Sequence, residues 1–275
     1  MDTGAAGGRF RGRVAIVTGS SRDPSIGRST ARRLAREGAS VVINGRSDEP
    51  LRSAERELRD EGLEVAGVAG SLQDDATAAR LVDAAIDRYG RLDAVVNTVG
   101  GTWYQGSPRD IDRAAFLKTV ELNTWGTIAL VQEALRGGLA DGGGAVVNVS
   151  SGTVNKTTPS MIAYAAAKAA LNAVTRTLAR DLGPLGVRVN AVAPGLTKTS
   201  GTRSMWESDD GAAAGRNLVL GRLTTADDIA NACAFLLSDE AASITGVVID
   251  VDGGNHLQGG GWTPMAAADP PHRAP

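Results

Sequence analysis

Seven short runs of β-branched and other apolar residues recur along the chain, and longer segments with helical periodicity separate them. The runs cover residues 14–18, 40–44, 65–69, 93–97, 145–150, 187–193 and 247–251. Several are apolar throughout, which is typical of strands covered on both faces. Helices are predicted over 26–38, 51–62, 76–90, about 110–136 and 161–183, with C-terminal stops at Gly38, Gly62, Gly90 and Gly183. This alternation predicts an α/β fold with a seven-stranded parallel, doubly wound sheet.

The composition narrows the class of protein. The 275 residues carry a net charge of −2, so no basic excess points to nucleic acid. The lone cysteine, Cys233, lies in an apolar helical pattern and excludes an internal disulfide. No apolar stretch is long enough for a membrane span or a signal peptide, so a cytoplasmic location is expected. We predict one domain over residues 13–257, between a flexible N-terminal arm (1–12) and a flexible C-terminal tail (258–275).

The turn after the first run, TGSSRDPSIGRS (18–29), has the strand–turn–helix context of a dinucleotide-binding loop. Gly19 permits the turn, and Gly27 permits close packing of the helix that begins at Ile26. Ser25 stands where a third glycine is usual, and it is also a good N-cap. An ordinary Gly/Ser turn is the alternative interpretation, because the two glycines are widely spaced.

The residues after the second run indicate which dinucleotide is bound. Enzymes that use NAD often place an acid here, where it binds the ribose 2′-hydroxyl. This chain has Gly45 followed by Arg46, and a guanidinium binds a 2′-phosphate with paired hydrogen bonds. Arg22 in the first loop is a second candidate, although either arginine can simply be solvated. We therefore predict NADP(H) as the cofactor.

Tyr164 and Lys168, in the sequence YAAAK, lie four residues apart on one face of a predicted helix. A nearby ammonium favours the phenolate, which makes the tyrosine a usable proton donor and acceptor near neutral pH. Ser151 follows the fifth run at the carboxyl end of the sheet, where doubly wound proteins bind ligands. Its hydroxyl can donate to a substrate carbonyl oxygen, or it can simply bond to local backbone.

Together these segments resemble the short-chain dehydrogenase/reductase family over about residues 13–255. The matching motifs are TG…IG (18–27), NTVG (97–100), Asn123 in ELNTWG, the serine pair at 150–151, YAAAK (164–168), VRVNAVAPG (187–195) with Thr199, and VDGG (251–254). The resemblance implies a single-domain Rossmann fold and hydride transfer between a nicotinamide and a carbonyl carbon.

The resemblance also implies roles for individual residues. Tyr164 would be the general acid/base, and Ser151 would polarise the carbonyl. Lys168 would hold the ribose hydroxyls and tune Tyr164, while Asn123 would hold a water that links Lys168 to solvent. The implied cofactor-binding set is Gly19, Ser21, Arg22, Ser25, Ile26, Arg46, Ser71, Leu72, Asn97, Gly100, Tyr164, Lys168, Pro194, Gly195, Thr197 and Thr199.

Three features depart from the family pattern. The usual NNAG is NTVG, so Thr98 and Val99 replace an amide and a small residue, and we expect looser packing there. Ser71 and Leu72 stand where an acid usually follows the third strand, so some adenine contacts must come from backbone groups or elsewhere. The opening loop is similar to the enoyl-thioester reductase branch, but that branch needs a tyrosine seven residues before its lysine, and here that residue is Met161. The spacing favours a carbonyl/alcohol enzyme.

Residues 196–225 break all periodicity, and so long a connection favours an active-site lid, with a polar loop as the alternative. Large aromatic residues on both rims favour a small-molecule carbonyl substrate that is bulky or aromatic. The predicted substrate-binding residues are Trp103, Ser151, Tyr164, Met205 and Trp206. With so few histidines, no metal site is expected. The long helices near 110–136 and 160–182, and the family resemblance, favour a homotetramer, with a dimer as the alternative.

These observations predict an NADPH-dependent ketone reductase that forms a secondary alcohol, with Tyr164 as the general acid. One alternative is an NAD(P)+-dependent alcohol or sugar dehydrogenase. Another is a non-catalytic NADP(H)-binding sensor or regulator. The set Ser151, Tyr164, Lys168 and Asn123 argues against the sensor, because a sensor does not need a proton relay.

Overall fold

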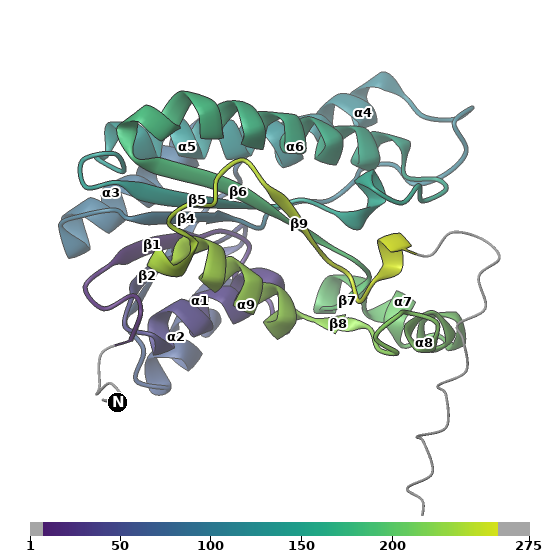
Figure 1. The fold of residues 1–275 in the computed structure, drawn as a ribbon, viewed down its shortest axis with the longest axis horizontal. Coiled ribbons are helices and arrows are strands. Elements are labelled where there is room, and N and C mark those ends of the chain that lie inside the picture. Colours follow the sequence, from purple (N-terminus) through teal and green to yellow (C-terminus); the bar gives the residue numbers. More distant parts are fainter. Residues whose placement is uncertain (1–7, 258–275) are drawn as a thin grey trace, which may run out of the picture.

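The computed structural model describes residues 8–257. Within that range, seven parallel strands form a sheet with the order β3-β2-β1-β4-β5-β6-β9 (Figure 1). The strands are β1 (Val14–Val17), β2 (Ser40–Gly45), β3 (Val65–Ala69), β4 (Ala94–Asn97), β5 (Gly144–Val149), β6 (Val187–Pro194) and β9 (Val248–Val251). The strand order reverses direction between β1 and β4, and ligands bind at such a point in doubly wound sheets. The predicted seven-stranded Rossmann-type sheet is confirmed.

Helices cover both faces of the sheet, so the strands are apolar on both sides (Figure 1). One face carries α1 (Ile26–Arg36), α2 (Asp48–Asp60) and α9 (Ala226–Leu237). The other carries α3 (Asp75–Tyr89), α5 (Gly126–Arg136) and α6 (Ile162–Leu182), with α4 (Arg113–Val120) beside α6. No helix in the described part of the chain is both long and apolar enough to cross a bilayer.

The long helix predicted over 110–136 is interrupted. Between α4 and α5, residues Glu121–Trp125 form a π-helical turn, and Asn123 lies at its centre. The π turn covers only five residues, which is shorter than the window over which a hydrophobic period can be recognised. Such turns are frequent at functional sites.

Residues 8–12 are better anchored than the predicted flexible arm. Phe10 is 2% exposed and packs in the core beside α1. Its backbone N–H donates to the Glu37 carbonyl oxygen at 3.0 Å. Arg9 forms ion pairs with the carboxylates of Glu37 and Glu240, which links this segment to the turn after α9. The expectation of an arm free up to residue 12 is therefore wrong for residues 8–12, while the predicted tail (258–275) lies outside the described residues.

The predicted lid, residues 196–225, contains short regular elements. It includes β7 (Thr197–Lys198), α7 (Arg203–Trp206), α8 (Asp209–Arg216) and β8 (Thr224–Thr225). β7 and β8 pair with each other in parallel and form a separate two-stranded sheet, so the two ends of the segment lie side by side. Helices this short produce too few repeats for a periodic pattern.

Candidate active site

The glycine-rich turn between β1 and α1 has the geometry that its sequence predicts. Gly19 has φ +66°, a left-handed conformation that glycine adopts readily. A Cβ atom on Gly27 would lie 2.5 Å from the carbonyl oxygens of Thr18 and Gly19, so a side chain would push α1 away from the turn. Ser25 caps α1, because its hydroxyl accepts a hydrogen bond from the Arg28 N–H at 3.1 Å. A helix N-terminus in this position favours a bound anion.

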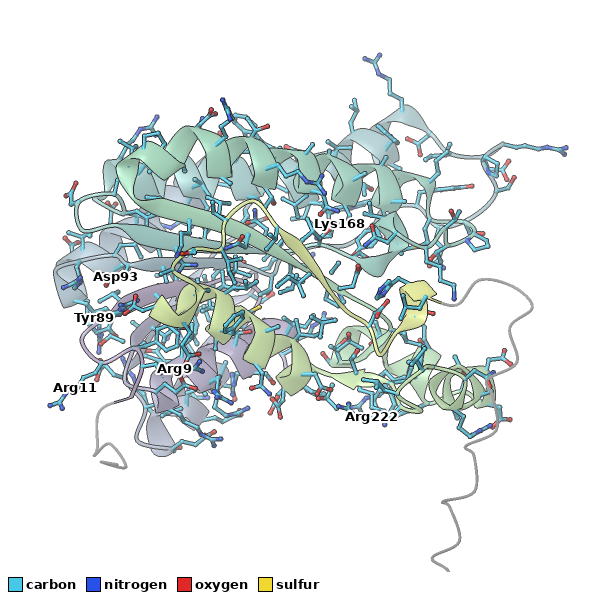
Figure 2. All side chains as sticks on the ribbon, in the orientation of Figure 1. Arg9, Arg11, Tyr89, Asp93, Lys168 and Arg222 are labelled. Carbon is cyan, nitrogen blue, oxygen red and sulfur yellow. The ribbon has the colours of Figure 1, made fainter. Side chains whose placement is uncertain are left out.

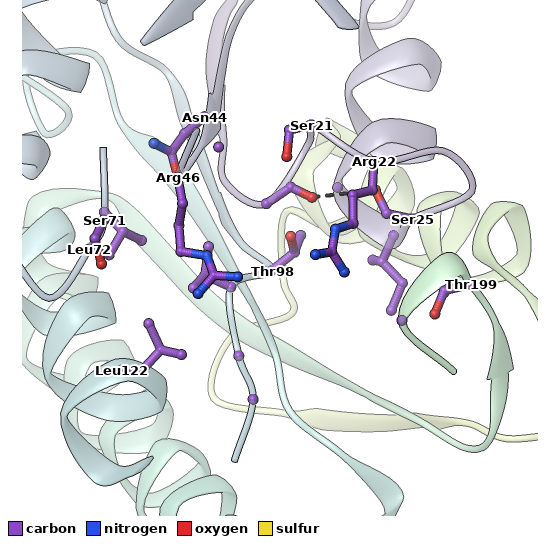
Figure 3. A pocket seen from close by; sticks show the side chains of 18 of the residues that line it. Ser21, Arg22, Ser25, Asn44, Arg46, Ser71, Leu72, Thr98, Leu122 and Thr199 are labelled. Atoms are coloured by element: carbon purple, nitrogen blue, oxygen red, sulfur yellow. Dashed lines mark hydrogen bonds between the residues drawn. The ribbon is translucent and has the colours of Figure 1, made fainter. Parts of the chain in front are cut away.

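A cavity of about 530 Å³ lies between this turn, the ends of β2 and β4, and residues 199–201. Figure 3 shows Arg22 and Arg46 extending into it. Among its lining residues in the described chain, these arginines carry the only charges, and no carboxylate is present. The predicted residues that line it are Gly19, Ser21, Arg22, Ser25, Ile26, Arg46, Ser71, Leu72, Gly100, Trp103 and Thr199.

Other residues predicted to bind the cofactor do not line this cavity. Asn97 is 2% exposed, and its amide donates to Asn148 Oδ1 at 2.9 Å, which ties β4 to β5. Thr197 is also buried, and its hydroxyl donates to the Gly195 carbonyl oxygen at 3.0 Å. Pro194 ends β6 and Thr197 follows it in β7, whereas Asn97 ends β4. Their cofactor contacts remain predictions.

Ser151, Tyr164 and Lys168 come together where β5 ends. Ser151 is 8% exposed, and its Oγ accepts hydrogen bonds from the N–H and hydroxyl of Thr153 at 3.2 and 3.0 Å. Tyr164 and Lys168 lie one turn apart on α6, and the lysine Nζ is 5.7 Å from the centre of the tyrosine ring. Lys168 lies between α6 and the sheet (Figure 2), and its Nζ donates to the Val149 carbonyl oxygen at 2.8 Å. The helix face predicted from YAAAK is thus directed at the end of β5.

The ionisation of this cluster differs from the expectation. Burial raises the pKa of Tyr164, and the hydrogen bond with the Ser151 hydroxyl opposes that shift without reversing it. Burial also lowers the pKa of Lys168 to about 7, because an ammonium loses its hydration there. The expected phenolate stabilised by a lysine ammonium is therefore not present in the protein alone. The physical reason is that desolvation dominates at both groups.

Asn123 anchors the loop that follows β4. Its Oδ1 accepts from the Gly101 N–H at 3.2 Å, and its Nδ2 donates to the carbonyl oxygens of Gly101 and Thr119, both at 2.7 Å. A Cβ atom on Gly100 would lie 2.7 Å from Asn123 Oδ1 and 2.9 Å from Lys168 Nζ. Gly100 lines the cavity, whereas Asn123 and Lys168 do not, so this pair lies directly behind the cavity wall at Gly100. Backbone groups already bind the Asn123 amide, so its contact with a water remains a prediction.

Thr98 tightens the site, contrary to the expectation of looser packing. Its N–H donates to the Thr18 hydroxyl at 3.0 Å, and its own hydroxyl donates to the Thr18 carbonyl oxygen. Val99 packs against the apolar cluster between the sheet and α3. Thr98 and Val99 thus stand in place of the usual amide and small residue. The Thr98 hydroxyl supplies local hydrogen bonds, and the branched Val99 side chain supplies apolar contact.

Several cavity residues were not predicted from the sequence. Asn44 ties β2 to the end of β3, because its amide donates to the carbonyl oxygens of Val68 and Gly70 at 3.0 and 3.1 Å. A polar residue at the end of an apolar run was the available signal. Ser200 carries no such signal, since only its backbone is used: its N–H donates to the Pro24 carbonyl oxygen at 2.8 Å. We call residues 199–201, which reach the glycine-rich turn in this way, the strap.

The two lid residues predicted to bind substrate lie outside the cavity. The Trp206 indole N–H donates to the Thr199 carbonyl oxygen at 2.9 Å, and Lys198 Nζ lies 5.8 Å from the ring centre. Trp206 therefore braces α7 against the strap. Met205 is 53% exposed. Substrate contacts of both residues remain predictions.

The loop that follows Ser151 is connected to the end of β9. The Asn155 amide donates to Asp250 Oδ1 at 2.7 Å. Nearby, the Nδ1 atom of His256 contacts both carboxylate oxygens of Asp252, at 3.1 and 3.0 Å. These hydrogen bonds account for the grouping of Asp250, Asp252 and His256, which hold the C-terminal end of β9 beside the site.

The fold and this cluster define a dinucleotide-binding α/β oxidoreductase, and comparison with known proteins identifies its family. A family model described as "Enoyl-(Acyl carrier protein) reductase" matches residues 19–256. The "Dehydrogenase/reductase SDR family member 4" of Caenorhabditis elegans is 34% identical over 251 residues, which cover 90% of this chain and 96% of the relative. The "Cis-4-hydroxycyclohexanecarboxylate dehydrogenase" of Sinomonas cyclohexanicum is 38% identical over 250 residues, which cover 90% and 98%.

A solved short-chain type dehydrogenase/reductase from Mycobacterium ulcerans has the same fold, with a TM-score of 0.86 and 35% identity over 90% of this chain and 91% of that chain. The chain belongs to the short-chain dehydrogenase/reductase family. It is an oxidoreductase acting on hydroxyl or carbonyl substrates, and its family binds a nicotinamide cofactor, NAD or NADP.

Proposed function

We propose that this chain reduces a ketone to a secondary alcohol with NADPH, in a reaction that is reversible in principle. The observation that carries the proposal is the grouping of Ser151, Tyr164 and Lys168 beside a cavity whose only charged lining side chains, in the described residues, are arginines. The lining suits a phosphorylated dinucleotide, because it offers two guanidinium groups and a helix N-terminus and no carboxylate that would repel a phosphate.

The nicotinamide supplies the hydride when the cofactor is bound. The Ser151 hydroxyl donates a hydrogen bond to the carbonyl oxygen and stabilises the negative charge that develops on it. Tyr164 gives its proton to the same oxygen. Its raised pKa keeps it protonated at neutral pH, which suits a proton donor in the reductive direction. Lys168 holds the ribose hydroxyls and, with a pKa of about 7, exchanges protons near neutral pH; Asn123 supports it through Gly100 and Gly101.

The role of Tyr164 is tested by Tyr164→Phe. We expect turnover to fall about a thousandfold, because a general acid typically contributes 10²–10⁴-fold. NADPH binding, followed by nicotinamide fluorescence, should change little. Tyr89→Phe is the matched control, since Tyr89 ends α3 outside the cavity lining and its hydroxyl donates to Glu64, just before β3. Turnover of Tyr164→Phe within tenfold of the unaltered enzyme would contradict this role.

The cofactor preference is tested by Arg46→Ala. Loss of a charge-assisted contact worth roughly 2 kcal/mol should raise the Kd for NADPH about thirtyfold and leave that for NADH nearly unchanged. Arg52→Ala is the control, because Arg52 is exposed on α2 and pairs only with Asp48 among the ion pairs of the described chain. An equal loss of affinity for NADPH and NADH would exclude a 2′-phosphate contact.

The proposed substrate class is based on Trp103 in the cavity lining and on the name of one relative. The name of the Sinomonas relative describes a hydroxyl on a cyclohexane ring, and Trp103 lines the cavity of this chain. Both support a ketone that is bulky or ring-bearing. An NAD(P)+-dependent alcohol or sugar dehydrogenase catalyses the same reaction in reverse. Initial rates of ketone reduction and of alcohol oxidation therefore distinguish the two functions. NADPH binding with no oxidation across a ketone panel would favour a sensor instead.

A second candidate, reduction of an enoyl thioester, is suggested by the description of the family model and by the opening loop. Met161 stands seven residues before Lys168, so a proton-donating phenol is missing from the position that the enoyl branch uses. Including a short enoyl thioester in the assay panel separates the two reactions. We expect NADPH oxidation with ketones and none with the thioester.

We also propose a homotetramer, with a dimer as the alternative. Leu117 on α4, Trp125 in the π-helical turn and Ile162 on α6 are 51%, 43% and 48% exposed. Large apolar side chains exposed on neighbouring helices favour a subunit contact. Light scattering at micromolar concentration measures the number of subunits directly.

A further inference from the structure

At the end of β2, Gly45 has too little space around it for a side chain. The proposed cofactor preference does not explain this by itself. Gly45 is the last residue of β2 and occupies the position where an acid binds the ribose in NAD enzymes. A Cβ atom on Gly45 would lie 2.6 Å from Ser21 Cβ and 2.8 Å from Ser21 Oγ. Contacts this short do not occur between real side chains, and the backbone of Gly45 does not have positive φ. Space alone, and not conformation, therefore keeps a side chain out of position 45.

The glycine-rich turn is held in the place that creates this contact. The Ser20 N–H donates to the Asn44 carbonyl oxygen at 2.8 Å, which fixes the turn to the end of β2. The Ser20 hydroxyl also donates to the Val17 carbonyl oxygen at 3.0 Å. From the other side, the buried guanidinium of Arg28 donates to the Ser20 carbonyl oxygen at 3.5 Å and pairs with Glu57 at 2.7 Å. Ser21 cannot move away from Gly45 without breaking part of this arrangement.

We propose that Ser21 is a specificity-determining residue, which occupies the space that a ribose-binding carboxylate at position 45 would need. Ser21 lines the same cavity as Arg22 and Arg46, so its hydroxyl is also placed on the side where these cations lie. In this chain the arginines would attract a phosphate on the adenosine ribose, and Ser21 sterically prevents position 45 from carrying the acid that favours the coenzyme without that phosphate. This inference rests on the proposed function.

The test compares Gly45→Asp, Ser21→Gly, and the double variant S21G/G45D. Titration of nicotinamide fluorescence gives the Kd for NADH and for NADPH in each protein. Gly45→Asp alone should weaken both coenzymes at least tenfold, because the aspartate must displace the turn. The double variant should recover NADH affinity at least tenfold relative to Gly45→Asp and leave NADPH weak, because only then does the carboxylate fit.

The matched control is S21A/G45D. Alanine keeps the Cβ atom that makes the 2.6 Å contact and removes only the hydroxyl. We therefore expect no recovery of NADH affinity in this variant. Recovery in S21A/G45D equal to that in S21G/G45D, or no recovery in either, would overturn the proposal.

Failure of the proposed function gives a different result. If the unaltered protein binds NADH as tightly as NADPH, the cofactor preference is wrong. The coupling between positions 21 and 45 is still measurable in that case, because thermal unfolding reports the clash without any coenzyme. Gly45→Asp should lower Tm, Ser21→Gly should restore it and Ser21→Ala should not. Additive effects on Tm would overturn the steric pairing itself.

Discussion

At the scale of single residues, the proposed catalytic role of Lys168 conflicts with the stability of the fold. Lys168 is 2% exposed, and burial lowers its pKa to about 7. Its Nζ donates to the Val149 carbonyl oxygen and lies near the Tyr164 ring, and neither group carries a full negative charge. A charged amine in such a place costs folding free energy, because its hydration is lost without an anionic partner.

We predict that Lys168→Met abolishes turnover and makes the protein more resistant to heat, most clearly at low pH. Below pH 7 the lysine is protonated in the folded and the unfolded chain, so the full cost of burying the charge is present. As pH rises from about 7 towards the ordinary value of 10.5, the folded chain loses the proton first and the cost is relieved. The gain in Tm should be on the order of 5 °C at pH 6 and less than about half of that at pH 9.

Differential scanning calorimetry at the two pH values measures this effect. Lys118→Met is the control, because Lys118 is exposed on α4 and its removal should leave Tm unchanged at both values. A gain of the same size at pH 6 and pH 9 would mean that packing by the methionine, and not the buried charge, sets the stability.

The sequence predicted the local role of several residues correctly, but it did not predict the surroundings of others. Ser25 caps α1 as expected, since capping depends on local chemistry. The clustering of Ser151 with Tyr164 follows from one motif and one strand end. The pKa values of Tyr164 and Lys168 did not follow, because burial depends on which residues far along the chain cover a group. Thr98 was misjudged for the same reason: its partner, Thr18, directly follows another strand, β1.

At the scale of elements, the end of α6 uses two glycines in different ways. Gly183 is the C-cap of α6, as predicted, but its φ is −55°, which is ordinary helical backbone. The chain continues through the 3₁₀ turn Gly183–Leu185 and reverses at Gly186, where φ is +76°. Both glycines fit the sequence rule for a helix end, and only the backbone shows which one has the left-handed conformation.

The two glycines should therefore respond in opposite ways to alanine. Gly183→Ala should stabilise the protein by about 0.5 kcal/mol, because alanine restricts the unfolded chain and nothing lies within 4 Å of the new methyl group. Gly186→Ala should destabilise it by about 1 kcal/mol, because φ is positive there. Urea unfolding measures both free energies. Stabilisation by Gly186→Ala would show that the turn tolerates another conformation.

All seven strands were predictable, several of them because buried parallel strands are continuous apolar runs. The π-helical turn, the short lid helices and the strap were not predictable. They rest on a one-residue change in helix pitch, on helices of four and eight residues, and on a contact between backbone groups. These are the elements that shape the site, so the sequence determined the scaffold more clearly than the cavity.

At the scale of the whole molecule, the strap joins parts of the chain that are far apart in sequence. The Ser200 N–H reaches the Pro24 carbonyl oxygen, and Trp206 braces the same segment through the Thr199 carbonyl oxygen. The Ser200–Pro24 hydrogen bond links the lid to the glycine-rich turn at the wall of the cavity. The strap and the glycine-rich turn therefore both form part of the cavity wall.

We predict that Ser200→Pro speeds release of the coenzyme about fivefold, because it removes one hydrogen bond worth roughly 1 kcal/mol. Proline fits this position: Ser200 begins a 3₁₀ turn, and Thr199 before it is extended, with φ −133° and ψ 166°. Ser200→Ala keeps the N–H group and should release the coenzyme at the original rate. Stopped-flow displacement measures both rates, and equal rates in the two variants would exclude a role for this bond.

The two guanidinium groups of the cavity have an effect that extends to every binding measurement on this protein. A cavity lined by cationic side chains and by no anionic side chain attracts small oxyanions. We expect sulfate or phosphate from a buffer to compete there with the proposed coenzyme, raising the melting temperature while weakening apparent coenzyme affinity. The strength of binding is therefore a joint property of the protein and of the salt in which it is dissolved.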